Sequence, residues 1–431
     1  MPPPMTAGPR DDRKAIAAWC LYDWGNSAFT TLVVTFIYSV YFTQAMVPDE
    51  NLGTLYWSRA VGISAVLIGI LSPILGAAAD KGGRRKQYLA ATTIISVAAT
   101  VAIAFVAPDT PNAVVLALGA FVIANVGFEL GIVFYNSFLP VIAPPDRLGR
   151  ISGLGWGVGY IGGLACLVVA LVGFVQPDVP WFGLAKENGF HIRATNLLVA
   201  AWFAVFALPL FFWVRETPIR GARVTLAGTL RELAETFRNL RRFREVMLYL
   251  VAHLVYNDGL VTIWAFGAVY AGGTFDMPLS EVIVFGIALN VVAGLGAYLF
   301  GFVDDRIGGK KTIMITLVAL SMATLLAVWA PDKTWLWIAG LLVGIFGGPN
   351  QAASRSLMAR FVPARHQTEF FGLYQLSGKV TSFAGPMLLG WATFAFGSQR
   401  AGIATILIFF VAGAILLNRV DERRGIAAAR D

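Results

Sequence analysis

Charged residues are scarce in this chain. Only 13% of its 431 residues are Asp, Glu, Lys or Arg, whereas about a quarter of the residues in a soluble globular protein are charged. Hydrophobic residues make up 57%, and the mean hydropathy is +0.69. Twelve membrane helices of about 20 residues would need about 240 apolar positions, close to the number available. The composition excludes a soluble enzyme or a nucleic-acid-binding protein and predicts an all-α membrane protein.

Cysteine is also nearly absent, and the nucleotide-binding motifs are incomplete. Cys20 and Cys166 lie in separate apolar stretches, which excludes a disulfide scaffold and a paired-cysteine metal or redox site. The glycines of segment 157–162 match a dinucleotide fingerprint in spacing, but they lie inside a predicted span with no preceding strand. Segment 378–381 lacks the first glycine of a phosphate loop. We expect no cofactor, no metal, no ATP-driven step and no enzymatic activity.

Long apolar segments predict twelve membrane spans in two six-helix halves. The segments lie at 16–46, 57–79, 87–107, 112–138, 151–175, 194–214, 246–271, 279–303, 312–330, 335–358, 369–396 and 401–419. The polar stretch 215–245 separates the N-terminal half, 1–214, from the C-terminal half, 246–431. Its leucines recur at helical spacing among arginines, which favours an amphipathic helix on the membrane surface. The charged start of the chain has no cleavage signature, so the first span is expected to be retained.

The basic residues are distributed unevenly between the two sides of the membrane. Alternate connections and the two terminal segments carry 27 of the 33 Lys and Arg residues. The positive-inside rule places these segments, and therefore both termini, in the cytoplasm. The basic pI of about 9.6 thus reflects membrane topology, and we expect no nucleic-acid partner. We expect an inner (plasma) membrane protein of a bacterium.

Two loops at equivalent places in the halves share a pattern. One follows the second predicted span and the other the eighth, at a constant separation of 225 residues. The matched pairs are Gly76 with Gly301, Asp80 with Asp305, Gly83 with Gly308, Arg85 with Lys310, and Lys86 with Lys311. A generic basic turn explains the bases but not the shared spacing of glycines and aspartate.

The residue types in these loops suggest a conformational latch. Gly76 and Gly301 allow a neighbouring helix to approach closely. Asp80 and Asp305 can face the positive N-terminal end of a helix from the other half. The bases Arg84, Arg85, Lys310 and Lys311 can pair with nearby acids and hold one face of the protein shut.

The paired loops and the six-plus-six layout resemble the major facilitator superfamily. Further segments are similar to its "unknown major facilitator" family: 22–29 (YDWGNSAF), 134–136 (FYN), 155–163, 256–259 (YNDG), 354–356 and 369–374 (EFFGLY). That family is related to fungal vacuolar amino-acid effluxers linked to autophagy, and the resemblance therefore implies membrane transport without defining the substrate. The antiporter pattern of the fifth span is incomplete, because Val158-Gly159 stands where Gly-Pro is needed.

Five ionisable residues stand out at membrane depth, where charge is costly and usually faces a cavity or a partner. They are Asp23, Glu129, Asp258, Arg355 and Lys379. A helix rise of 1.5 Å per residue places Asp258 about 18 Å and Lys379 about 15 Å into their spans. Both are therefore expected near the midplane, where such transporters bind their substrates.

Polar and aromatic side chains share helix faces with these charges and complete the predicted substrate site. The site comprises Asp23, Asn26, Trp156, Tyr160, Asn257, Asp258, Arg355, Gln375 and Lys379. Both signs of charge around one cavity suit a zwitterion. Lys379 or Arg355 would meet its carboxylate, and Asp258 or Asp23 its ammonium group or a coupling cation. The alternative for any one residue is a structural tie, for example between Asp23 and Arg355.

Glu129 is the candidate proton carrier, since a carboxylate removed from water takes up a proton more readily. The sequence thus predicts a monomeric secondary transporter in the lipid bilayer that moves small zwitterionic solutes, amino acids first, with a proton or sodium ion as possible coupling ion. The alternatives are efflux of amphipathic drugs or lipids, and a sensor or scaffold that transports nothing.

Overall fold

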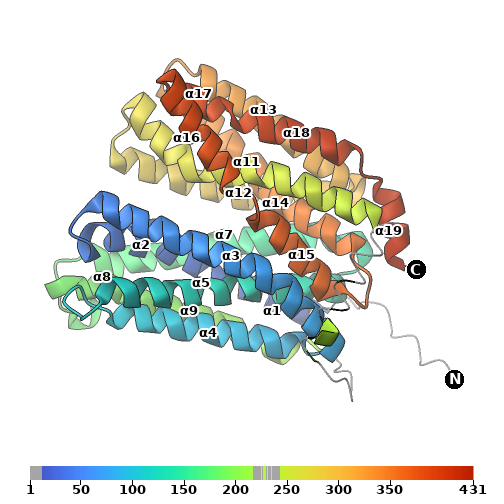
Figure 1. The fold of residues 1–431 in the computed structure, drawn as a ribbon, viewed down its shortest axis with the longest axis horizontal. Helices are drawn as coiled ribbons and strands as arrows, with labels where there is room; N and C mark the ends of the chain where they lie inside the picture. Colours follow the sequence, from blue (N-terminus) through green and yellow to red (C-terminus); the bar gives the residue numbers. More distant parts are fainter. Residues whose placement is uncertain are drawn as a thin grey trace.

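The computed structural model describes residues 12–216, 225, 227–229, 231, 234 and 243–430. All regular secondary structure in these ranges is helical. Figure 1 shows two bundles stacked on one another, the N-terminal half coloured blue to green and the C-terminal half yellow to red. The predicted connector helix over 215–245 lies largely outside the described residues.

The N-terminal half contains the first six spans. Its helices are α1 (Arg13–Ala28), α2 (Tyr38–Tyr41), α3 (Glu50–Gly82), α4 (Arg85–Phe105), α5 (Ala113–Ser137), α6 (Leu139–Ile142), α7 (Leu148–Ala170), α8 (Phe190–Arg193) and α9 (Thr195–Trp213). Wider π-helical turns at Phe29–Phe36 and Phe42–Met46 continue the first span, and a third at Leu171–Val175 continues the fifth. Single 3₁₀ turns occupy Pro145–Arg147, Trp181–Gly183 and Glu187–Gly189.

The C-terminal half contains the remaining spans. Its helices are α11 (Arg244–Phe275), α12 (Leu279–Ile307), α13 (Gly309–Trp329), α14 (Lys333–Phe361), α15 (Gln367–Lys379), α16 (Ala384–Phe396), α17 (Gln399–Ala404), α18 (Ile406–Asn418) and α19 (Glu422–Arg430). Aspartates begin several helices, as at α14, where the Asp332 carboxylate accepts a hydrogen bond of 2.8 Å from the Thr334 amide. Such caps satisfy amides that have no partner within the helix.

Eleven segments of the described chain are long and apolar enough to cross a membrane. The eleventh predicted span, 369–396, is missing from this set because it is not one continuous helix. It consists of α15 and α16, separated by a turn at 380–383. Pro386 in the first turn of α16 has no amide hydrogen, and its ring would clash with the carbonyl of Ser382 in a continuous helix. The break follows directly after Lys379.

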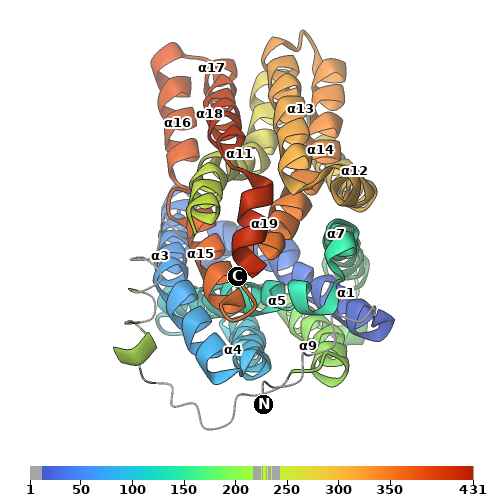
Figure 2. The same ribbon diagram turned by 90° about the vertical axis from the view of Figure 1, so that its right-hand side faces the viewer.

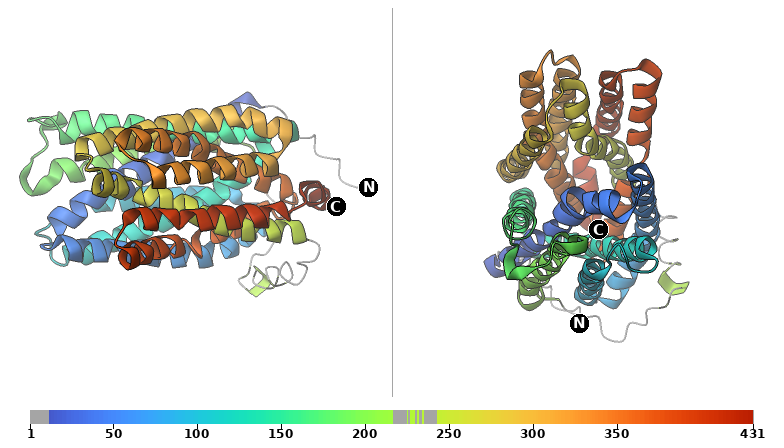
Figure 3. Two further views of the ribbon diagram at one scale, coloured as in Figure 1. Left: turned by 90° about the horizontal axis from the view of Figure 1, so that it is seen from above. Right: turned by 90° about the vertical axis from the view of Figure 1, so that its left-hand side faces the viewer.

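Helix α1 begins and helix α19 ends at the same end of the molecule, here called the terminal end (Figure 1). Figure 2 looks onto this end, and Figure 3 shows the molecule from above and from the opposite end. The halves meet mainly where α7 packs on α12 and α3 packs on α15. Glycines make these approaches possible: a side chain at Gly153 would strike the Ala297 backbone, and one at Gly372 the Ser72 backbone.

Candidate functional site

A cavity of about 290 Å³ lies between the two halves. Helices α1, α5 and α7 supply its wall from the N-terminal half, and α11, α14 and α15 supply the wall from the C-terminal half. The lining includes eight of the residues expected from the sequence: Asp23, Asn26, Glu129, Trp156, Asn257, Arg355, Gln375 and Lys379. Charges of both signs therefore face one space in the interior of the bundle.

The most accessible charges in the cavity form an ion pair between the halves. Lys379 Nζ at the end of α15 lies 2.6 Å from Glu129 Oε1 on α5, and Gln375 Nε2 donates to Glu129 Oε2 at 2.5 Å. The side chains of Lys379 and Glu129 keep 28% and 15% of their surface exposed. A molecule in the cavity can reach both charges without displacing the backbone.

Arg355 on α14 is held much more completely. Its guanidinium donates to the carbonyl oxygen of Ser152 at 2.7 Å and to the Ser152 hydroxyl at 3.0 Å, and it lies 3.3 Å from Asp23 Oδ2. Trp19 stacks over it at 4.6 Å and Trp156 at 5.5 Å, a favourable arrangement for a cation over aromatic rings. With only 4% of its side chain exposed, Arg355 ties α14 to α1 and α7. Trp156 covers this tie and borders the cavity.

Two residues expected in the substrate site do not line the cavity. Tyr160 lies behind the wall, where its hydroxyl donates to Gln351 Oε1 at 2.8 Å. Asp258 lies on the face of α11 turned towards α16, where its carboxyl interacts with the Gly385 amide. For Asp258 the reason is helical rotation, because consecutive residues point about 100° apart and its neighbour Asn257 is the one that faces the cavity. Neither Tyr160 nor Asp258 lines the cavity, and their part in substrate binding stays a prediction.

Other lining residues were not assigned to the site from the sequence. The Tyr374 ring packs at a tilt of 31° against the His253 ring, with the ring centroids 4.2 Å apart, and His253 Nδ1 lies 2.8 Å from the Ser377 hydroxyl. Tyr374 precedes Gln375 directly and lies four residues before the lining residue Gly378. Residues four apart lie on the same face of a helix, so this spacing along α15 could have assigned Tyr374 to the cavity from the sequence.

At the terminal end, each repeated loop contacts the start of a helix from the other half. Asp80 at the end of α3 accepts hydrogen bonds from the Glu369 amide and the Thr368 hydroxyl of α15, both at 2.8 Å. Gly76, one turn earlier, lies against the Thr368 backbone. The Arg85 side chain lies 3.2 Å from Asp80 and bonds to Gln367.

The second loop repeats this geometry with the halves exchanged. Asp305 at the end of α12 accepts from the Gly149 amide at 2.7 Å and the Arg150 amide at 3.2 Å, at the start of α7. Gly301 lies against the backbone of the same two residues. Arg150 Nε lies 2.6 Å from Asp305 as well. In both loops a carboxylate meets the positive end of a helix across the boundary between halves.

A buried acid next to the second loop was not assigned from the sequence. Asp304 lies 2.6 Å from Arg360 of α14 and also bonds to Ser356. Arg360 further approaches Asp305 and Glu422, each at 3.7 Å. The terminal end of the C-terminal half is therefore a network of charges.

The sequence comparison paired Lys86 with Lys311, but the contacts of the lysine side chains pair Lys86 with Lys310. Lys86 Nζ binds the carbonyl oxygens of Phe211 and Val214 at 2.6 and 2.8 Å, at the end of the sixth span. Lys310 Nζ does the same with Asn418 and Val420 at 2.9 and 2.6 Å.

Lys86 is therefore the counterpart of Lys310, not of Lys311, and this pair is separated by 224 residues. The first loop holds Gly83 and Arg84 between its helices, whereas Gly308 alone links α12 to α13. Both glycines have positive φ, +56° and +94°, in the region that favours glycine at a helix end.

A carboxylate completes each of these turns. Glu216 accepts from the Arg85 and Lys86 amides at 2.7 and 3.0 Å, and Glu422 accepts from the Gly309 and Lys310 amides at 2.9 and 3.2 Å. Each lysine and carboxylate together join the end of a half's last span to the start of its third. We call each such pair a clip.

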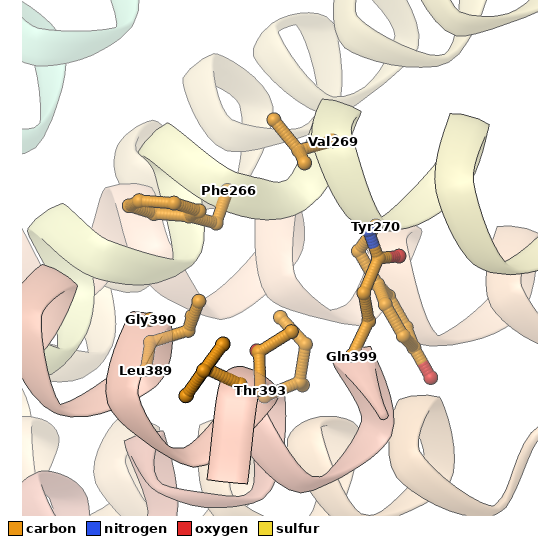
Figure 4. A pocket seen from close by; sticks show the side chains of 9 residues that line it. Phe266, Val269, Tyr270, Leu389, Gly390, Thr393 and Gln399 are labelled. Atoms are coloured by element: carbon orange, nitrogen blue, oxygen red, sulfur yellow. The ribbon is translucent and has the colours of Figure 1, made fainter. Parts of the chain in front are cut away.

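A second cavity of about 310 Å³ lies within the C-terminal half between α11, α16 and α17. Figure 4 shows its lining, which includes Phe266, Val269, Tyr270 and Leu389. The lining carries no charged side chain, and Gln399 there already accepts a hydrogen bond of 2.7 Å from Thr274. This cavity offers no charge to a polar substrate.

Comparison with known proteins agrees with this architecture. The fold is shared with the transporter FucP in its outward conformation (TM-score 0.77, 15% identity, covering 96% of this chain and 100% of that one). It is also shared with the proton:xylose symporter XylE (TM-score 0.72, 16% identity, 96% of each chain). Both are transporters of the major facilitator superfamily. The protein thus has the twelve-helix major facilitator fold.

Sequence relatives narrow the class to a family. Residues 54–430 match the family described as "Vacuole effluxer Atg22 like", and the chain belongs to this family. It is 27% identical over 409 residues to the uncharacterized MFS-type transporter YxiO of Bacillus subtilis, covering 94% of both chains. It is 21% identical to autophagy-related protein 22 of Coccidioides immitis, covering 86% of this chain and 72% of that one.

Proposed function

We propose that this protein is a secondary active transporter of small zwitterionic solutes, amino acids first, that works by alternating access. The observation that carries the proposal is the accessible ion pair between Glu129 and Lys379 in the cavity. It offers a zwitterion one partner of each sign, from different halves of the protein. The family's description as vacuole effluxers supports a transported solute, and the resemblance to amino-acid effluxers supports its class.

Substrate binding would proceed by exchange of partners. The substrate carboxylate takes the place of Glu129 beside the Lys379 ammonium, and the released Glu129 meets the substrate ammonium group or accepts a proton. Asn26, Asn257 and Gln375 supply neutral donors and acceptors around it. The exchange breaks the direct tie between α5 and α15 and replaces it with one through the substrate, so binding is coupled to the relative position of the halves.

The latch residues would set the alternation. Asp80 and Asp305 each bond to a helix of the other half at the terminal end, and we propose that these contacts hold that end shut and break when the halves rock and the cavity opens there. The concentration of basic residues on the terminal side favours a cytoplasmic location for both termini in a bacterial plasma membrane. In that orientation the proposed latch would close the cavity to the cytoplasm.

A ligand-stabilisation screen of the purified protein tests the proposal. Amino acids, dipeptides and amphipathic drugs are compared for their effect on Tm, because a ligand that binds only the folded state raises Tm. We expect amino acids among the hits, and loss of their effect in Lys379→Ala and Glu129→Gln. Lys333→Ala is the matched control, since Lys333 forms an exposed ion pair with Glu281 (3.1 Å) away from the cavity. Stabilisation by drugs alone, or a hit that survives both cavity substitutions, would contradict it.

A further inference from the structure

Asp258 is a buried acid that the substrate cavity does not use. It lies in the middle of α11 with 2% of its surface exposed. Its Oδ1 has no hydrogen-bond partner in the structure, and no ion pair reaches it from the described residues. A carboxylate without a counter-charge at membrane depth is costly, and this cost makes such residues functional candidates.

The surroundings of Asp258 are formed by the broken eleventh span. Its carboxyl interacts with the amide of Gly385, the second residue of α16, and with the side chain of Thr381 in the break. The nearby Thr262 hydroxyl is already used, since it donates to the Asp258 backbone carbonyl at 2.7 Å. The acid therefore sits at the N-terminal end of a 13-residue half-helix.

The ionisable groups on the neighbouring helices all have other partners. On α11 itself, His253 bonds to Ser377 at 2.8 Å and Tyr256 to Ser354 at 2.8 Å. The helices α16 and α18, which pack on α11, contain no ionisable side chain.

The two bases closest along the packed helices are also engaged. Lys379 of α15 pairs with Glu129, and Arg355 of α14 pairs with Asp23. Arg400 of α17, which also packs on α11, donates to the Val328 carbonyl oxygen at 2.6 Å, and no cation of the described residues forms an ion pair with Asp258.

A proton is the counter-charge that this geometry can accept. Addition of a proton to Oδ1 forms one O–H bond and removes the negative charge of the carboxylate, and it requires no further ligand. A sodium ion would need several further oxygen ligands around Oδ1, and the Thr262 hydroxyl is already turned towards the backbone. A proton needs only the single unpartnered oxygen.

We propose that Asp258 is a proton-binding site, separate from the substrate cavity, whose loading sets the geometry of the break in the eleventh span. When Asp258 is ionised it attracts the positive end of α16, and when it is protonated this attraction weakens. Lys379 is the last residue of α15 before the same break. A change of charge on Asp258 is thereby transmitted to the position of the lysine that holds Glu129. The coupling rests on the proposed transport function, whereas the proton site itself does not.

Infrared difference spectroscopy of the full-length protein in liposomes, titrated from acid to alkaline pH without any substrate, tests the site. The carbonyl band of a protonated buried carboxyl group is expected in the wild type and is expected to be lost in Asp258→Asn. Asp258→Glu should keep the band at a shifted frequency. Glu129→Gln serves as the matched cavity variant and should leave the Asp258 band in place. A spectrum of Asp258→Asn identical to the wild type would overturn the proposal.

Thermal unfolding over the same pH range gives a second readout. Asn keeps an acceptor for the Gly385 amide but carries no charge, so Asp258→Asn should have a higher Tm than the wild type at alkaline pH. The gap should close as the pH falls and Asp258 takes up its proton. The same measurement at alkaline pH is repeated with sodium chloride and, as a control, with potassium chloride. If sodium chloride alone raises the Tm of the wild type but not that of Asp258→Asn, the site binds sodium and the proposal of a proton site is overturned. Because no substrate is present, a failed ligand screen leaves both readouts intact.

Discussion

Lys379 and Glu129 lie on opposite halves of the protein, and their side chains meet at 2.6 Å inside the cavity. Both side chains are more exposed, at 28% and 15%, than those of Arg355 and Asp23, at 4% and 11%, which form the second ion pair between the halves. We propose that the more exposed pair exchanges partners with a ligand and that the buried pair holds the halves together.

Replacement of Lys379 by Ala should weaken binding of a zwitterionic ligand by about tenfold or more, because a charge-assisted hydrogen bond is lost. Binding can be measured by calorimetry with a hit from the stabilisation screen. Lys379→Arg should retain part of the affinity, since the charge remains. Equal affinity in the Ala variant and the wild type would remove Lys379 from the site.

Replacement of Arg355 by Ala should destabilise the protein by about 3 kcal/mol, since it leaves the buried Asp23 carboxylate without its partner. Arg355→Lys should recover little, because an ammonium group cannot bond to Ser152 twice and also stack on Trp19. The measurement is denaturant unfolding in detergent. Gln351→Ala, which removes only a neutral contact to Tyr160, is the control and should cost much less.

Replacement of Gly76 by Leu should force open the terminal end, because a side chain there would strike the Thr368 backbone. Spin labels on cysteines substituted for the exposed Lys14 and Arg306 report the distance between halves. The native Cys20 and Cys166 are buried. We expect the distance between the two labels to be longer in Gly76→Leu than in the parent protein. The distance should not change in the control Gly119→Leu, where a side chain would enter open space. An unchanged distance in both would argue against a latch.

The same labels separate the latch from the clips. Asp80→Asn weakens a contact between halves and should shift the population towards an open terminal end. Glu216→Gln weakens a contact within one half and should lower Tm without changing the distance. A similar shift in both variants would mean that the end opens by loosening of the half itself.

The sequence was sufficient to predict the fold because membrane spans and paired loops leave local signals. Apolar length marks the spans, and the spacing from Gly76 to Gly83 recurs from Gly301 to Gly308. The depth of Lys379 follows from helix rise alone. None of these features depends on how the helices are rotated about their axes.

What could not be predicted depends on rotation and on local deviations from a regular helix. Asn257 and Asp258 are neighbours in sequence and equally deep, yet only one faces the cavity. The break after Lys379 could not be predicted from the presence of Pro386 alone. Prolines inside α3, α9 and α14 are accommodated within continuous helices, whereas Pro386 lies in the first turn of a new helix. The first loop is one residue longer than the second, so Lys86 corresponds to Lys310. A comparison at a constant separation of 225 residues could not predict this correspondence.

The two clips have a practical consequence for work with this protein. Glu422 belongs to the last described helix, yet its carboxylate holds the start of α13, more than a hundred positions earlier in the chain. A truncation made after the twelfth span to shorten the tail would therefore loosen the middle of the C-terminal bundle. Purification tags and fusion partners belong beyond Arg430, and the segment from Asn418 to Glu422 should be left intact in any shortened form.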